Sequence, residues 1–356
     1  MTPSTKSGLR ELRYVEAVRE AMAQEMEADP SVFIMGLDVD DPKRILGSTK
    51  GLVEAFGPDR IFTTPLSEDA MTGVAIGAAM AGMRPIHIHI RVDFLMLCMN
   101  QLVNMAAKTH YMYGGTVRVP LVVRAIIGKS WGQGAQHSQA LHSMFMHVPG
   151  LKVVMPSNAH DAKGCMIAAI RDNNPVLVLE HRTLFDIPSE VPEEPYAVPF
   201  GKCRVYPKGN DITIVGISNM VVECLRAQEL LAEAGIGAEV IDPISLVPLD
   251  IETILQSVKR TGRLLVIDNA WTNCGASAEI IARVAETPGM PAGLVMRRSG
   301  FAPTPCPTAS NLEKLFYPNP ATIAAFASQM VRGDDGWVPD ASRYDRSQTT
   351  PFRGPF

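Results

Sequence analysis

Two neighbouring carboxylates, Glu68 and Asp69, lie in the segment TPLSEDA, where an extended stretch meets the small-residue run GVAIGAAMAG. One interpretation is a plain helix start, with Ser67 as the N-cap and both carboxylates favoured by the positive end of the helix dipole. The other is a ligand site, because α/β sheets usually bind ligands beyond the carboxyl ends of their strands. The residues alone favour the helix start, so a catalytic glutamate needs support from a wider pattern.

Three histidines could also carry chemistry. His137, in the segment GAQHSQ, follows a loop that is broken by glycines. An imidazole there could move a proton near neutral pH, although a loop histidine is usually just solvated. His87 and His89 alternate on one face of a predicted strand, but two imidazoles without a third ligand argue against a metal.

Length and composition limit the classes of protein that can hold these groups. A chain of 356 residues with 46% apolar and 20% charged residues is long enough for two folded domains. The net charge of −4 gives no basic surplus for nucleic acid. The six cysteines are scattered without metal-ligand spacing, and the longest nearly uncharged run, 70–83, is too short to span a membrane. We therefore expect a cytoplasmic protein with reduced thiols.

Hydrophobic periodicity predicts an α/β fold with a mostly parallel sheet, since short β-branched runs alternate with amphipathic stretches. In the first half we expect strands at 31–35, 84–90, 121–126, 152–155 and 176–180, and helices at 12–27, 68–81, 94–113 and 159–171. In the second half we expect strands at 212–215, 238–241, 264–267 and 293–296, and helices at 221–234, 251–260 and 276–285.

Proline content predicts the domain boundary. Residues 186–200 contain four prolines without a helical or alternating period, which indicates a stiff linker. The predicted domains are residues 1–185 and the smaller unit 201–331, followed by an extended or mobile tail, 332–356.

A resemblance then links these features. The segment TPLSEDAMTGVAIGAAMAGMRPI resembles the stretch that carries the catalytic glutamate in β subunits of 2-oxo acid dehydrogenase first components. Five further blocks resemble the same pyruvate dehydrogenase β-like family in the same order, namely VDFLMLCMNQLVNMAAKTHYMYGG, VPLVVR, GAQHSQ, PGLKVVMPSNAHDAKG and AIRDNNPVLVLEH. The resemblance covers residues 10–330 and implies a transketolase-like pyrimidine-binding domain followed by a transketolase C-terminal-like domain that VPFGKCRV opens.

The resemblance also implies roles for individual residues. Glu68 would hydrogen-bond a pyrimidine nitrogen of thiamine diphosphate and so help to activate the cofactor. Phe94 would pack against the pyrimidine ring, although an ordinary core phenylalanine is its alternative. Leu66 and Ile90 would complete the apolar lining, and His137 would bind the substrate carboxylate or move a proton during acyl transfer.

Metal ions and partners follow from the same resemblance. Leu121, Ala169, Ile170, Asp172 and Asn174 match a potassium site of some members, although AIRDNNP also reads as a plain helix exit. The sequence lacks the GDG and following asparagine that hold Mg²⁺ and the diphosphate in this cofactor class. An α subunit is therefore expected to bring them, in an α2β2 assembly with the active site between subunits. His142 and His147 lie beyond the matching motif and are expected to be bystanders.

The expected reaction is oxidative decarboxylation of a 2-oxo acid, with transfer of the acyl group to a lipoyl acceptor. Pyruvate is the expected substrate, with branched-chain acids or acetoin close behind. Two alternatives stay open: an acyloin-forming carboligase or acetoin dehydrogenase β subunit, and a non-catalytic regulatory β-like subunit. A split transketolase is more distant, because its motif usually runs Glu-Gln-Asn where this chain has Ser67-Glu68-Asp69.

Overall fold

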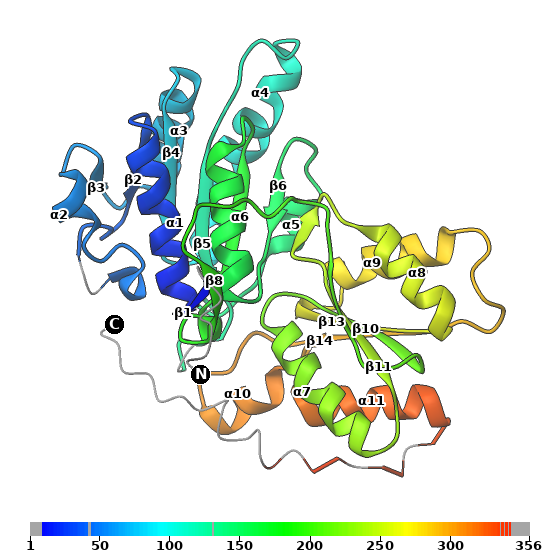
Figure 1. Cartoon of the computed structure of the whole chain (residues 1–356). Coiled ribbons are helices and arrows are strands. Elements are labelled where there is room, and N and C mark those ends of the chain that lie inside the picture. Colours follow the sequence, from blue (N-terminus) through cyan, green and yellow to red (C-terminus); the bar gives the residue numbers. More distant parts are fainter. Residues whose placement is uncertain are drawn as a thin grey trace, which may run out of the picture. The chain divides into compact units, whose positions relative to one another are not determined.

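The computed structural model describes residues 9–41, 44–129, 132–334, 336–337, 339–340 and 342 (Figure 1). Within these residues the chain divides into two compact units, one made of residues 9–127 and 144–200 and the other of 128–143 and 201–342. The loop 128–143, which carries His137, therefore groups with the second unit and not with the first domain in which the sequence places it. Most of the predicted tail, 332–356, lies outside the described residues.

The first unit is built on a parallel sheet whose strands run in the order β6-β7-β5-β4-β2-β3. Strands that are buried on both faces have nearly continuous β-branched sequences, so the sequence pattern predicts most of these strands. The strands are β2 (Val32–Gly36), β3 (Ile61–Thr63), β4 (Arg84–His89), β5 (Val122–Ile127), β6 (Lys152–Val154) and β7 (Val176–His181).

Helices of the first unit mostly follow the prediction. Helix α6 (Ala159–Arg171) begins where Asn158 accepts a hydrogen bond from the Asp161 N–H at 2.9 Å, which is the usual role of an asparagine at an N-cap. The other helices are α1 (Tyr14–Ala28), α2 (Leu52–Phe56) and α3 (Glu68–Met80), with 3₁₀ turns η1 (Arg44–Gly47) and η4 (Arg182–Leu184). The short helix α5 (His142–Met146) begins with the last two residues of loop 128–143 and continues into the first unit.

The single helix predicted over 94–113 is wrong in detail. The chain forms a 3₁₀ helix η2 (Val92–Cys98), a π-helix η3 (Asn100–Ala106) and an α-helix α4 (Ala107–Met112). In η2 the buried residues Val92, Leu95 and Cys98 recur every three positions, which is the period of a 3₁₀ helix and not of an α-helix.

The predicted linker, residues 186–200, contains a strand and packs with the first unit. Strand β8 (Pro188–Pro192) pairs antiparallel with β1 (Leu9–Arg13). Its two prolines stand at the ends of the strand, where a missing N–H interrupts the ladder least, and Val191 between them is fully buried.

The second unit is a smaller sheet in the order β14-β13-β10-β11-β9, in which only β9 is antiparallel to its neighbour. Its strands are β9 (Arg204–Pro207), β10 (Ile212–Gly216), β11 (Ala238–Asp242), β13 (Arg263–Trp271) and β14 (Val295–Phe301), and β12 (Ser245–Val247) is a further short strand. The helices are α7 (Met220–Glu233), α8 (Ile251–Thr261), α9 (Ala276–Glu286), α10 (Ser310–Phe316) and α11 (Pro320–Arg332).

Helices α10 and α11 were not predicted. Helix α11 begins with Pro320 behind the N-cap Asn319, and its Ile323, Ala324 and Ala327 join the core beside α7. None of the described helices is both long enough and apolar enough to cross a membrane.

Candidate active site

The residues expected around the cofactor lie beyond the carboxyl ends of two parallel strands of the first unit. Leu66 and Glu68 follow β3, whereas Ile90 and Phe94 follow β4, and both strands flank β2. This edge is where open α/β sheets bind ligands. Local sequence order thus brings a carboxylate and three apolar side chains to one end of one sheet.

Glu68 is the first residue of α3, at the positive end of the helix dipole. Its backbone oxygen accepts a hydrogen bond from the Thr72 hydroxyl at 2.7 Å, and among the described residues its half-buried carboxylate has no hydrogen-bond or ion-pair partner. Ser67 occupies the N-cap position, but its side chain makes no capping hydrogen bond. A helix start therefore explains where Glu68 lies, but it does not explain the role of its carboxylate, which has no partner among the described residues.

Helix η2 lies beside the start of α3. Burial, with a smaller contribution from the nearby carboxylates of Glu68 and Asp69, raises the pKa of Cys98 to about 11. Phe94 of η2 and Ile90 are half-buried, whereas Leu66 is 74% exposed. An open carboxylate bordered by apolar side chains fits a flat ring with polar edges, which is the chemistry of an aminopyrimidine.

His87 and His89 form a buried layer beneath this site. Their rings meet edge to face with centroids 4.3 Å apart, and His87 Nε2 lies 3.2 Å from the Thr72 hydroxyl that binds the Glu68 backbone. Among the described residues no group of three His, Cys, Asp or Glu side chains could hold a metal ion. Burial lowers the pKa of both imidazoles, which favours their neutral form, and His87 packs against Thr72 of α3.

The pH dependence of stability should report this burial. Burial lowers the pKa of His87 from 6.5 to about 4, so between these values the unfolded chain binds more protons than the folded one. Stability should be complete above pH 6.5 and fall by up to about 3 kcal/mol as the pH approaches 4. Urea unfolding of the chain and of His87→Gln at pH 7 and pH 5 measures this. If the unchanged chain and His87→Gln lose the same stability between pH 7 and pH 5, His87 does not contribute to this pH dependence.

His137 lies on loop 128–143 and is half-buried, with its N–H 3.4 Å from the Gly134 carbonyl oxygen. Glu68 and His137 therefore belong to different units. His142, expected to be a bystander, is fully buried, and its Nε2 lies 3.0 Å from Asp268 Oδ1. Sequence reasoning missed this pair because 126 residues separate its members.

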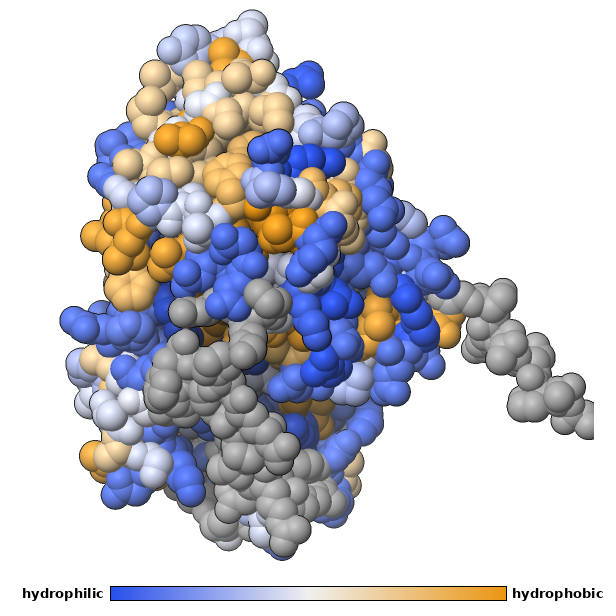
Figure 2. Space-filling view, turned by 90° about the vertical axis from the view of Figure 1, so that its left-hand side faces the viewer, coloured by the Kyte–Doolittle hydropathy of each residue, from blue (hydrophilic) through white to orange (hydrophobic). Residues whose placement is uncertain are grey.

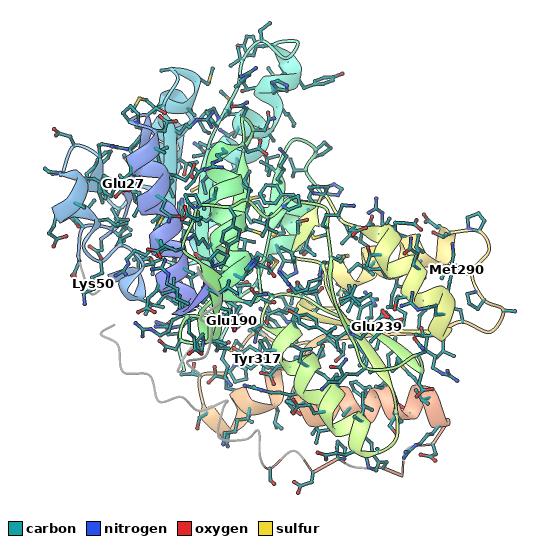
Figure 3. All side chains as sticks on the ribbon, viewed as in Figure 1. Glu27, Lys50, Glu190, Glu239, Met290 and Tyr317 are labelled. Carbon is teal, nitrogen blue, oxygen red and sulfur yellow. The ribbon has the colours of Figure 1, made fainter. Side chains whose placement is uncertain are left out.

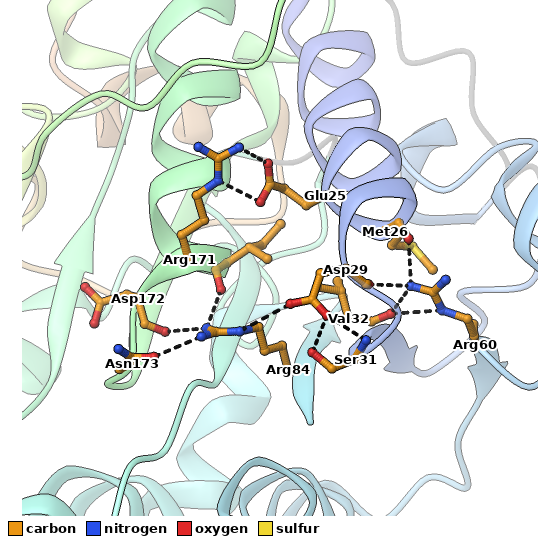
Figure 4. Close-up of polar contacts among 11 residues, drawn as sticks. Glu25, Met26, Asp29, Ser31, Val32, Arg60, Arg84, Arg171, Asp172 and Asn173 are labelled. Atoms are coloured by element: carbon orange, nitrogen blue, oxygen red, sulfur yellow. Dashed lines mark hydrogen bonds and ion pairs between the residues drawn. The ribbon is translucent and has the colours of Figure 1, made fainter. Parts of the chain in front are cut away.

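The five residues expected to bind potassium do converge around the end of α6. However, Arg84 donates to the carbonyl oxygens of Ile170 at 2.9 Å and Asp172 at 3.0 Å (Figure 4). Lys152 pairs with the Asp172 carboxylate, while Ala169 and Leu121 accept backbone hydrogen bonds. An ion here would share its oxygens with two cationic side chains, so potassium at Leu121, Ala169, Ile170, Asp172 and Asn174 stays a prediction and we derive no step from it.

Family models match both halves of the chain. The transketolase pyrimidine-binding domain matches residues 10–187, and the transketolase C-terminal domain matches residues 201–323. The acetoin:2,6-dichlorophenolindophenol oxidoreductase β subunit of Cupriavidus necator is 44% identical over 336 residues, which cover 91% of this chain and 98% of that relative. This chain belongs to the transketolase-like family of such β subunits.

Other members of the family have a second activity in their names. The pyruvate dehydrogenase E1 component β subunit of Rickettsia bellii is 44% identical over 308 residues, covering 85% of this chain and 94% of that relative. A solved structure named as a split-gene transketolase, an inactive β4 tetramer, matches with a TM-score of 0.74 at 20% identity, covering 90% of this chain and 99% of that one. That match supports the predicted transketolase-like α/β fold alone.

Proposed function

We propose that this chain is the β subunit of a heteromeric, thiamine-diphosphate-dependent enzyme that decarboxylates a 2-oxo acid and passes the acyl group to a lipoyl acceptor. The observation that carries the proposal is the open carboxylate of Glu68 at the start of α3, next to η2 and the carboxyl end of β4. Thiamine diphosphate, when bound, would supply the electron sink that stabilises the carbanion equivalent left by loss of CO₂.

The side chains of the first unit would bind and orient the pyrimidine half of the cofactor. The Glu68 carboxylate would hold a hydrogen bond to a ring nitrogen, and Phe94 would pack on the ring face. Ile90 and Leu66 would exclude water from its edges. His137 would bind the substrate carboxylate or move a proton during acyl transfer.

An α subunit is the proposed partner, and it would bind the diphosphate and Mg²⁺ in an α2β2 complex. Nine of the fifteen exposed large apolar side chains among the described residues fall between Leu66 and Tyr113. Figure 2 shows apolar surface gathered in the upper part of that view, at the height of α3 and α4 in Figure 1. Exposed apolar area of this kind supports a protein partner. Leu66, 74% exposed beside Glu68, supports a site that the partner completes.

Acetoin oxidation is the second candidate, because relatives from Cupriavidus necator and Bacillus subtilis, 44% and 39% identical, are named for it. The reconstituted α and β pair should be supplied in parallel with pyruvate plus a lipoyl domain and with acetoin plus dichlorophenolindophenol. Acyl-lipoyl product supports the first function, and dye reduction by acetoin alone supports the second. If neither substrate is converted while thiamine diphosphate binds, both reactions are excluded. A pair that binds no thiamine diphosphate would leave only a non-catalytic, regulatory β subunit.

A further inference from the structure

The loop 128–143 is seated on the second unit by contacts at both of its ends. Near its start, the Lys129 ammonium lies 5.5 Å from the ring centroid of Tyr317, a residue labelled in Figure 3. Burial lowers the pKa of Lys129, whereas the carboxylates of Glu313 and Glu223 raise it, which places both acids near this end of the loop. Near its start, the loop is therefore held to the second unit by a partly buried cation that interacts with an aromatic ring and with two acids.

The middle of the loop lies against the chain around Thr308. Gly134 has φ +70°, and a Cβ at this position would stand 2.5 Å from the Thr308 hydroxyl. Gly132, with φ +76°, would place a Cβ 3.0 Å from the Thr308 carbonyl oxygen. Glycine permits this close approach but leaves the backbone itself without rigidity. Side chains outside the glycine segment must therefore fix where the loop lies.

His142 supplies the fixed point at the far end of the loop. Its Nε2 lies 3.0 Å from Asp268 Oδ1, and both side chains are fully buried. The second carboxylate oxygen, Oδ2, accepts the Ser277 N–H at 3.0 Å in the first turn of α9. Because Asp268 accepts the Ser277 N–H through Oδ2, we assign its Oδ1 as the acceptor of a hydrogen bond that the His142 Nε2–H donates. Asp268 is held by β13 and α9, which makes it a rigid acceptor.

We propose that His142 is a positioning residue, whose hydrogen bond to Asp268 holds loop 128–143 in place and so sets the position of His137. This inference rests on the proposed role of His137 and adds a function for the second unit. In this role the second unit holds a loop, residues 128–143, that lies in the first half of the sequence. His142 lies five residues after His137. A displacement of His142 from Asp268 should therefore also displace His137.

The test uses the reconstituted pair with its α subunit. In His142→Ala, kcat should fall about 10- to 100-fold, because a misplacement of about 1 Å can cost about 100-fold. The concentration of thiamine diphosphate that gives half-maximal activity should not change. His142→Gln, whose amide can donate in place of Nε2, should restore most of the loss. Ser257→Ala, which removes a buried hydroxyl bonded to Thr213 at 2.7 Å, is the matched control for destabilisation of the same unit.

Two further measurements separate positioning from simple loss of structure. Amide hydrogen exchange in His142→Ala should rise in residues 128–143 and stay unchanged in α7 and α11. In a His137→Ala background, the substitution His142→Ala should not lower kcat further, because His142 acts on the reaction only through the His137 side chain. Additive losses, or equal losses in His142→Ala and Ser257→Ala, would overturn the inference. Normal turnover of His137→Ala would instead refute the role proposed for His137, and with it this inference.

Discussion

Glu68→Gln should lower kcat of the reconstituted enzyme by about 10²- to 10⁴-fold, the range that a positioned acid or base contributes. Glutamine keeps the size of the side chain at the first position of α3 but cannot exchange a proton with a ring nitrogen. The carboxylate has no partner among the described residues, so its replacement should break no contact of the fold. Steady-state turnover with saturating cofactor measures the loss, and light scattering should show an unchanged assembly.

Asp69→Asn is the matched control for this substitution. Asp69 is the next residue in the same turn and carries the same charge, but it is exposed, and its Oδ1 accepts the N–H of Ala70 at 2.7 Å. Its turnover should stay within about twofold of the unchanged enzyme, because an exposed carboxylate interacts weakly across water. Equal activity in Glu68→Gln and the unchanged enzyme would remove Glu68 from the reaction and leave a non-catalytic β-like subunit as the better proposal.

Arg124→Met should destabilise the first unit by about 3–5 kcal/mol, the usual cost of leaving one member of a buried ion pair alone. Arg124 on β5 pairs with Glu180 on the neighbouring β7, and the two side chains are 1% and 0% exposed. Arg124 also donates to the Ser48 hydroxyl at 2.8 Å. Urea unfolding followed by circular dichroism measures the change.

The pH dependence of this loss gives an internal check. Burial raises the pKa of Glu180 even though the Arg124 guanidinium lowers it. Without Arg124 the carboxyl binds a proton more readily in the folded state, so the destabilisation should be smaller at pH 5 than at pH 8.

Two further variants show whether the buried charge causes this loss. The double variant Arg124→Met, Glu180→Met should recover most of it, since apolar replacement of both partners leaves no unpaired charge. As the matched exposed pair, Arg283→Met, which breaks the bond to Glu279, should cost only about 0.3–0.5 kcal/mol. A double variant as unstable as the single one would show that packing, and not charge, sets the cost.

Much of the fold could be predicted because its signals are local. The buried strands of the two sheets are short β-branched runs, and Asn158 caps α6 as its position indicates. Apart from the segment 94–113, the features that the sequence does not predict depend on contacts that are distant along the chain. Residues 188–192 look like a linker until β1 pairs with them, and α11 has no strong signal apart from the core that it completes.

The candidate site divides in the same way. Glu68 and Phe94 lie in blocks that resemble a family, and the ends of β3 and β4 bring them to one edge by local connection alone. The pair His142 and Asp268 could not be predicted, because nothing around either residue indicates its partner 126 positions away. Likewise, the sequence gives no sign that the guanidinium of Arg84 reaches the turn after α6.

The seating of loop 128–143 on the second unit limits how this gene can be recombined. The two family models suggest a cut between residues 187 and 201, and a fragment that ends there would keep His137 but lose Thr308 and Asp268. Chimaeras that exchange C-terminal halves between relatives would replace the surface that receives the loop. Crossovers that transfer 128–143 together with the second unit should therefore give more active hybrids than crossovers at the apparent boundary.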